Sequence, residues 1–233
     1  MKILKTIVFW FFICCVPLLL ITSNLRWGIN EIRVYEYGVD KYEISYVTRI
    51  DKPELMNVYQ HLIDYYNSEV DSAQVIVEKE GRKVAIFNEK ELIHLSDVKN
   101  LIQLDYVIQI AALLILLVCC LALLIVLKAR WHMLANGFLW GSVVTLGLMI
   151  FLALWSVFGF EQLFVLFHRL SFTNEFWILD PGADYLIMLF PGGFFYDIAL
   201  FGFAAVIIES LFLGAIAFII LKLEGKNLWP TGY

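Results

Sequence analysis

Four long apolar blocks constrain this chain more than any other feature of its sequence. A block of about 20 apolar residues is long enough to cross a bilayer, and 61% of this chain is hydrophobic whereas only 17% is charged. Because a backbone in hydrocarbon must satisfy its own hydrogen bonds, we expect each block to be a helix. The predicted spans are Ile7–Thr22, Tyr106–Leu127, Met133–Phe160 and Phe194–Leu221.

The first block has the basic start of a signal peptide, with Lys2 and Lys5 before the apolar run. Its end, Thr22-Ser23-Asn24, lacks the small-x-small pattern of a cleavage site. We therefore expect residues 1–23 to be an uncleaved transmembrane anchor. All four cysteines lie in predicted spans, where we interpret them as small apolar packing residues.

Basic residues mark one side of the membrane, because short cytoplasmic loops carry Lys and Arg. They precede the first span, separate the second from the third, and follow the fourth, as Lys2, Lys5, Lys128, Arg130, Lys222 and Lys226. Their positions agree if both termini are cytoplasmic. Residues 24–105 and the segment 161–191 then lie outside.

The predicted architecture is a mainly α membrane protein with about four transmembrane helices and a small α+β extracytoplasmic cap. Residues 24–105 form the cap, and residues 106–233 form a three-helix region that carries the outer segment 161–191. This segment is too polar to span and too apolar for an ordinary loop, which favours an aromatic, interfacial or re-entrant element.

Within the cap, hydrophobic spacing predicts helices as well as strands. Asn88 with Glu91 three residues later is typical of a capping box at a helix start. We expect a β-like stretch over Ile32–Ile50, a helix from Pro53, strands over Ala73–Val77 and Val84–Phe87, and a turn at Glu80–Lys83.

The first candidate for chemistry is His94. Glu91, His94 and Asp97 recur at intervals of three, so on a helix they can share one face. A carboxylate one turn away can orient an imidazole and raise its pKa. His94 precedes the second span by about ten residues, which places it near the outer interface.

The second candidate, His168, lies in the aromatic segment 161–191 and should emerge on the same side at a similar depth. Two histidines at one level beside several carboxylates indicate a site. His61 and His132 are interpreted as structural or neutral. The neighbours of His168 that we consider for binding or orienting are Arg169, Phe172, Trp177, Asp180 and Asp184.

The last span contains two ionisable residues, Asp197 near its outer end and Glu209 near its middle. Such residues are functional candidates by default, although we interpret Glu209 as a protonated, hydrogen-bonded carboxyl. Gly137 and Gly141 form a small-xxx-small pair that suggests close helix packing. No standard hydrolase or Walker motif is present, so we expect chemistry without a cofactor or metal, and no nucleic-acid partner.

Together these residues resemble the bacterial lipoprotein intramolecular transacylase family, over nearly the whole chain. One matching motif comprises Phe87, Asn88, Glu91, His94, Asp97, Val98 and Lys99. The other comprises Phe167, His168, Ser171, Phe172, Asn174, Trp177, Asp180, Pro181, Asp184, Phe190, Pro191, Phe194 and Phe195. The order of anchor, cap, spans and aromatic segment is similar too.

The resemblance implies a reaction within one diacylglyceryl lipoprotein in a bacterial cell membrane. An acyl chain leaves the glyceryl sn-2 oxygen and ends on the amine of the N-terminal cysteine, which produces a lyso-form lipoprotein. The catalytic pair would be His94 and His168. The resemblance leaves open which histidine is the base, and we expect a monomer whose partners are the lipoprotein and membrane lipid.

Other hypotheses remain open at this point. In a metal-dependent membrane hydrolase, His94, Asp97 and His168 would bind zinc. In a non-enzymatic accessory protein, the tyrosine-rich cap would bind a partner and the histidines would be dispensable. A small transporter is disfavoured because no charged pair crosses the predicted spans.

Overall fold

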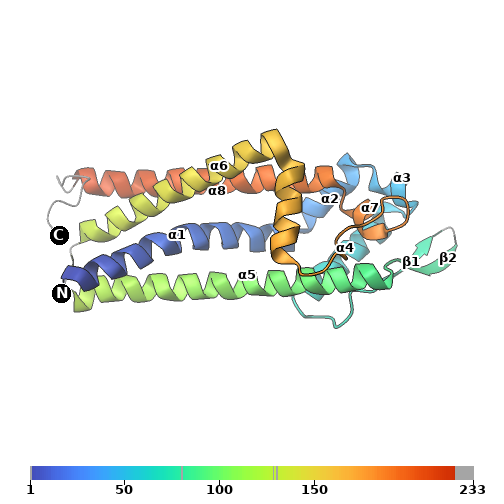
Figure 1. Cartoon of the computed structure of the whole chain (residues 1–233), viewed down its shortest axis with the longest axis horizontal. Coiled ribbons are helices and arrows are strands. Elements are labelled where there is room, and N and C mark those ends of the chain that lie inside the picture. Colours follow the sequence, from blue (N-terminus) through green and yellow to red (C-terminus); the bar gives the residue numbers. More distant parts are fainter. Residues whose placement is uncertain (1, 80, 128, 130, 224–233) are drawn as a thin grey trace. The chain divides into compact units, whose positions relative to one another are not determined.

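The computed structural model of the chain describes residues 2–79, 81–127, 129 and 131–223. Long helices alternate with short elements along the chain (Figure 1). The elements are α1 (Lys2–Asn30), α2 (Ile32–Lys41), α3 (Ile44–Thr48), α4 (Lys52–Tyr66), β1 (Ile76–Lys79), β2 (Arg82–Ala85), α5 (Glu89–Leu121), the π-helix η1 (Ala122–Val126), α6 (Trp131–Ser171), α7 (Tyr185–Leu189) and α8 (Gly192–Leu223).

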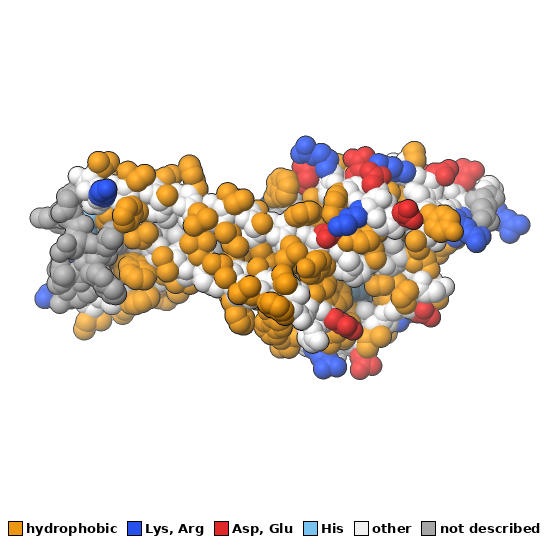
Figure 2. Space-filling model, turned by 90° about the horizontal axis from the view of Figure 1, so that it is seen from above, with side chains coloured by type: hydrophobic (Ala, Val, Ile, Leu, Met, Phe, Trp, Pro, Cys, Tyr) orange, Lys and Arg blue, Asp and Glu red, His pale blue; other side chains and the backbone are white. Residues whose placement is uncertain are grey.

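Among the described residues, four helices are long and apolar enough to cross a membrane, namely α1, α5 with η1, α6 and α8. Each coincides with one of the predicted spans, except that the second helix ends at Val126, one residue before the predicted end at Leu127. The sequence prediction of four transmembrane helices is therefore confirmed. Figure 2 shows hydrophobic side chains spread along the left-hand part of the molecule, with few charged side chains among them. A surface of this kind suits hydrocarbon and would be costly in water.

The chain divides into two compact units. The bundle unit comprises residues up to Leu25, Tyr106–Leu154 and the chain from Phe201 onward. The cap unit comprises Arg26–Asp105 and Trp155–Leu200. The segment that contains His168 therefore belongs to the same unit as the segment that contains His94.

Close contact between α1 and α6 holds the bundle unit together. A methyl group added at Gly141 would lie 2.6 Å from Cβ of Val16, and one at Gly137 would lie 2.6 Å from the ring of Phe12. Phe12 and Val16 also belong to the buried core of this unit. The small-xxx-small pair predicted from sequence is thus a helix contact, as expected where backbones approach closely.

Within the bundle unit, Glu209 has a polar partner on another helix. The Asn24 amide donates a 2.7 Å hydrogen bond to Oε2 of Glu209 and a second, of 2.9 Å, to the carbonyl of Leu20. The predicted hydrogen bonding of this carboxyl is therefore confirmed, and its partner lies on α1. Cys14, Cys15, Cys119 and Cys120 are all free thiols.

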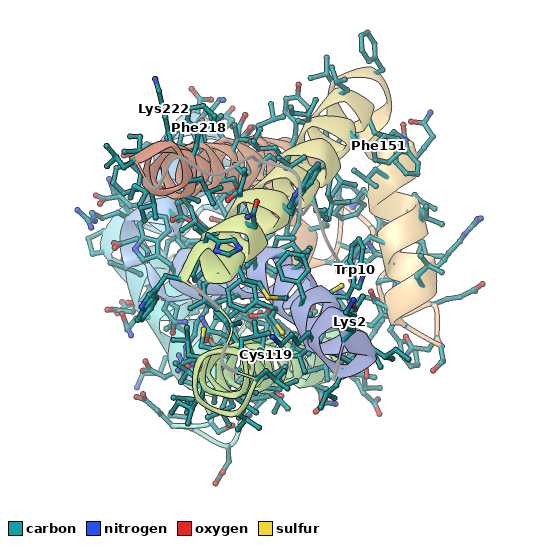
Figure 3. All side chains as sticks on the ribbon, turned by 90° about the vertical axis from the view of Figure 1, so that its left-hand side faces the viewer. Lys2, Trp10, Cys119, Phe151, Phe218 and Lys222 are labelled. Atoms are coloured by element: carbon teal, nitrogen blue, oxygen red, sulfur yellow. The ribbon has the colours of Figure 1, made fainter. Side chains whose placement is uncertain are left out.

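The basic ends of α1 and α8 lie together in the bundle unit. Figure 3 looks along the bundle at this end, where Lys2 and Lys222 are labelled on different helices. Lys128, Arg130 and Lys226, which also supported the predicted orientation, lie outside the described residues.

The predicted β-like stretch over Ile32–Ile50 is wrong, because this segment is helical. It forms α2 and α3, and the buried side chains of α2 include Tyr35 and Val39, four residues apart. That spacing places them on one helix face. Aromatic and β-branched residues suggested a strand here, but packing of this face overrides the local preference.

An aromatic core joins α2, α4 and the start of α8 inside the cap unit. The ring of Tyr59 lies 5.2 Å from that of Tyr35 and 5.4 Å from that of Phe190. The Tyr59 hydroxyl donates a 2.8 Å hydrogen bond to the carbonyl of Leu189. A side chain at Gly38 would overlap the Phe194 ring, so this core requires a glycine on α2.

A two-stranded antiparallel hairpin precedes α5. Strands β1 and β2 pair with Ile76 opposite Ala85 and Lys79 opposite Arg82. The sequence predicted a hairpin in this region, but β1 runs two residues past the predicted strand end at Val77, and β2 begins at Arg82, two residues inside the predicted turn Glu80–Lys83. Gly81 has a φ of +75°, which suits glycine in a tight turn, while Glu80 lies outside the described residues.

The α1–α6 contact can be tested with a single methyl group. Gly141→Ala should destabilise the protein by about 1–3 kcal/mol, because the new Cβ overpacks against Val16. Gly147→Ala is the matched control, since a Cβ at that position of α6 meets nothing within 4 Å. Thermal unfolding in detergent would measure both variants. An unchanged midpoint for Gly141→Ala would contradict the close contact.

Candidate functional site

The start of α5 positions His94. The backbone N–H of Asn88 donates to Oε2 of Glu91 at 2.8 Å, and the N–H of Glu91 donates to Oδ1 of Asn88 at 3.0 Å. This reciprocal pair is the capping box predicted from sequence. It determines where the helix begins, and therefore the direction in which His94, in the second turn of the helix, projects.

The bend in α6 positions His168. Gly159 interrupts the helix with φ −164° and ψ 52°, and His168 lies in the last turn before Ser171. Nδ1 of His168 lies 2.8 Å from the carbonyl oxygen of Phe164. Because a carbonyl oxygen can only accept, Nδ1 carries the proton and Nε2 presents a lone pair.

The two histidines meet inside the cap unit, with ring centroids 6.1 Å apart and planes inclined by 33°. Each residue is 7% exposed, so both imidazoles are largely shielded from bulk water. Sequence could place them only at a similar depth. Nδ1 of His94 is buried and has no hydrogen-bond partner within the described part of the chain.

Aromatic side chains surround this histidine pair. Phe172 places its ring edge-on to His94 at 5.1 Å and lies 5.6 Å from His168. Trp177 lies 5.0 Å from His168, and Phe164 lies 4.1 Å from it. Phe172 and Trp177 were both candidates from sequence. The aromatic cluster (Phe164, Phe172 and Trp177) gives the pair an apolar environment.

The apolar environment keeps both imidazoles neutral. They lie outside the predicted spans Tyr106–Leu127 and Met133–Phe160. Burial lowers the pKa of His94 to about 4, repulsion between two charged imidazoles acts in the same direction, and Asp97 opposes both. Burial also lowers the pKa of His168, although its hydrogen bond to Phe164 opposes the shift. A neutral imidazole presents one lone pair and one N–H, so it can accept a proton at one nitrogen and donate a hydrogen bond at the other.

Two of the predicted orienting carboxylates bond to groups other than the histidines. Glu91 is 1% exposed, and its Oε1 accepts the backbone N–H of Leu186 at 2.6 Å. Burial raises the pKa of Glu91, although bonds from the N–H groups of Asn88 and Leu186 oppose the shift. Oδ2 of Asp97 accepts a 2.8 Å hydrogen bond from the Asn174 amide. These bonds tie α5 to α7 and to the loop after α6.

Asp184 and Asp180 build the same loop. Asp184 accepts from the Asn88 amide and from the backbone N–H of Asp180, each at 2.8 Å. The bond from Asp180 is the main reason that the pKa of Asp184 is lowered. Oδ1 of Asp180 accepts the N–H of Gly182 at 2.8 Å. Arg169 is exposed beside His168.

Sequence reasoning missed two contributors to this site. The carbonyl of Phe164 sets the tautomer of His168. The Lys90 ammonium contacts the carbonyl of Ile178 and lies 3.7 Å from Asp184. The i, i+4 spacing of Phe164 and His168 was a usable signal, because such residues are neighbours on a helix, whereas the partners of Lys90 are distant in sequence.

The residues described by the structure contain no group of three or more His, Cys, Asp or Glu side chains placed to hold a metal ion. The alternative zinc set of His94, Asp97 and His168 is therefore not assembled as a ligand cluster. Asp97 already accepts from Asn174.

Comparison with known proteins gives a consistent match. The model of the family "Lipoprotein intramolecular transacylase Lit" matches residues 10–195. A solved structure of the membrane-integral Lit from Bacillus cereus is similar over 97% of this chain and 99% of that chain, with TM-score 0.81 and 21% identity. Two variants of that protein match over 96% of this chain and 95% or 96% of theirs, with TM-score 0.76 and 21% identity. A search of curated proteins finds no significant match.

The burial of His94 predicts a dependence of stability on pH. The folded protein holds this imidazole neutral to about pH 4, whereas the unfolded chain binds a proton below about pH 6.5. The stability is therefore complete above about pH 6.5 and is lost as the pH falls toward 4. Unfolding midpoints in detergent should show this loss in wild type and a smaller one in His94→Gln. An equal pH dependence of the unfolding midpoint in the two proteins would contradict the assignment of this loss to His94.

Proposed function

Because the chain belongs to the lipoprotein intramolecular transacylase family, it is a multi-pass membrane acyltransferase that acts on lipoproteins, and we propose how its histidine pair transfers the acyl chain. The substrate is a diacylglyceryl lipoprotein with a free N-terminal cysteine amine. The ester bond between the acyl carbon and the glyceryl sn-2 oxygen breaks, and an amide bond to that amine forms. The observation that carries the proposal is the 6.1 Å approach of His94 and His168.

His168 is the general base of this proposal. Its Nδ1–H donates a hydrogen bond to the Phe164 carbonyl, so the lone pair of Nε2 is free to accept a proton from the attacking amine. A neutral imidazole is the protonation state that a general base requires. The amine proton moves to His168 as the carbon–nitrogen bond forms.

His94 is the donor. Its buried Nδ1 has no partner within the described residues, and an unpaired buried N–H is rarer than an unpaired acceptor. We therefore assign the proton of His94 to Nε2. From there it donates a hydrogen bond that stabilises the oxyanion of the tetrahedral intermediate and then the departing glyceryl oxygen. The proton that His168 accepted from the amine passes to that oxygen as the ester bond breaks, so both histidines return to their starting state.

The aromatic cluster directs the reaction toward the amine. Ester hydrolysis competes with aminolysis wherever water reaches the acyl carbon. Phe172 and Trp177 contact the imidazoles and supply an apolar wall that excludes water. Both reacting groups belong to one molecule, so the protein needs no nucleophile of its own and acts mainly by orienting the substrate.

The surrounding carboxylates position this machinery. Glu91 and Asp97 hold α5 against α7 and the loop, while Asp180 and Asp184 shape the loop that carries Trp177. Arg169 is exposed and is proposed to contact a lipid phosphate. These five residues act through position or substrate binding and take no part in proton transfer.

We infer that both termini are cytoplasmic and that the cap, residues 24–105, lies outside with segment 161–191. The shared basic end of α1 and α8, with Lys2 and Lys222, supports this orientation (Figure 3). Membrane lipid is a proposed partner because Phe158 and Leu170 are 85% and 78% exposed in the second half of α6.

The proposed domains are the anchor, residues 1–23, the cap, and the transmembrane region 106–233. The histidine pair is assembled from one chain, which supports a monomer.

The histidine pair gives the first prediction for activity. His94→Ala and His168→Ala should each lower acyl transfer by about 10²–10⁴-fold, the usual contribution of general acid–base catalysis. Mass spectrometry of a lipoprotein's N-terminal peptide, from a host lacking this protein, would measure the N-acylated monoacylglyceryl cysteine. His61→Ala and His132→Ala are controls that should retain activity. A lipoprotein that stays diacylglyceryl with well-expressed wild type would contradict the proposed function.

The aromatic cluster gives the second prediction for activity. Trp177→Ala should admit water beside His168, so a larger share of the acyl chains is released as free fatty acid and a smaller share reaches the amine. Chromatography of both products from one reaction would measure the ratio. Trp27→Ala is the control, because this exposed tryptophan of α1 lies outside the aromatic cluster. A lower rate with an unchanged product ratio would mean that Trp177 does not exclude water.

A further inference from the structure

The hairpin in front of α5 has one covered edge and one free edge. On β1, the backbone N–H of Glu78 points away from β2 and donates to Oε1 of Glu54 at 3.1 Å. Glu54 lies in the first turn of α4, so α4 covers this edge. In an antiparallel pair, two opposite residues either bond each other or both point outward.

The register assigns the outward groups of the other edge. Glu78 lies opposite Lys83, and Ile76 lies opposite Ala85. Because Glu78 points outward, the N–H and C=O groups of Lys83 and Ala85 also point outward, on the far side of β2. No hydrogen bond joins these backbone groups to any other described residue. The free edge is therefore a short template for another strand.

The hairpin that carries the free edge is held in place by side-chain bonds at both of its ends. The Lys79 ammonium bonds to the Tyr185 hydroxyl at 2.7 Å and lies over the ring of the same residue. Beyond the strands, the Gln74 side chain bonds to both the N–H and the C=O of Phe87, at 3.1 and 2.7 Å. The edge is preorganised, so an incoming strand would not have to order it.

The free edge is also close to the histidine pair. Ala85 is separated from His94 by four residues of extended chain and five residues of helix. The rise per residue of each conformation makes the distance between them at most about 21 Å. A peptide of about six or seven extended residues spans this length. The chain that follows the acylated cysteine of a lipoprotein can therefore reach the edge while the cysteine is at the site.

We propose that the free edge of β2 binds the polypeptide of the substrate lipoprotein as an added third strand. The proposal rests on the proposed function. Backbone hydrogen bonds to Lys83 and Ala85 would accept any extended sequence, as in other strand-addition complexes. The exposed cations Arg82 and Lys83 would favour acidic side chains in the bound segment. The simpler alternative is that these cations only keep the edge from aggregating.

The test uses synthetic diacylglyceryl lipopeptides that carry one N-methyl group at successive peptide bonds, from the third to the eighth residue. Only alternate N–H groups of a bound strand face its neighbour. We expect methylation at every second position to raise KM about three- to tenfold, the loss of one backbone hydrogen bond, with kcat unchanged. Methylation between those positions should have little effect.

A variant provides an independent check on the same edge. Ala85→Pro removes an outward donor without breaking the ladder to β1, so it should raise KM for the lipopeptide. Diacylglyceryl cysteine amide, which has no peptide to bind, should keep its KM. The proposal would be overturned if N-methylation had no alternating effect and if the lipopeptide and the diacylglyceryl cysteine amide reacted with equal kcat/KM. Acyl transfer would persist in that case, whereas failure of the proposed function would abolish transfer on every substrate.

Discussion

The buried carboxylate of Glu91 is the interaction on which the rest of the site depends. One of its oxygens caps the helix that begins after Asn88, and the other accepts the N–H of Leu186 at the start of α7. A single side chain thus determines where α5 begins and which element lies beside it. Because a carboxylate is costly to bury without partners, both bonds are needed to keep Glu91 at this position.

Hydrogen bonds and aromatic contacts have different roles in the rest of the site. Asp97 and Asp184 hold the loop by directional hydrogen bonds, while Phe172 and Trp177 fill the space around the imidazoles. Directional bonds specify position, and apolar contact removes water and keeps the imidazoles neutral. An acyl transfer that must avoid hydrolysis requires both properties at one place. The same loop provides them, which explains its unusual mixture of aromatic and acidic residues.

Sequence reasoning succeeded where the chemistry is local or where the solvent constrains it. The four spans followed from the length of the apolar blocks, and the capping box of Asn88 and Glu91 followed from their spacing. It failed over Ile32–Ile50, where the helix α2 is stabilised by contacts such as Gly38 against Phe194. Those partners are more than 150 positions apart, so no local pattern could reveal them. The tautomer of His168 also required its carbonyl partner to be located in space.

By itself, the sequence determined that this is a membrane protein with four spans, that two histidines lie near carboxylates and aromatic residues, and which family it resembles. These conclusions depend on composition and on short spacings, which the chain carries whatever its tertiary fold. Only the tertiary structure decided that His94 and His168 meet, that their carboxylate neighbours bind the backbone and loop, and that one hairpin edge is free. Each of these facts depends on a distance between segments, and the burial that neutralises the imidazoles exists only once those segments have packed.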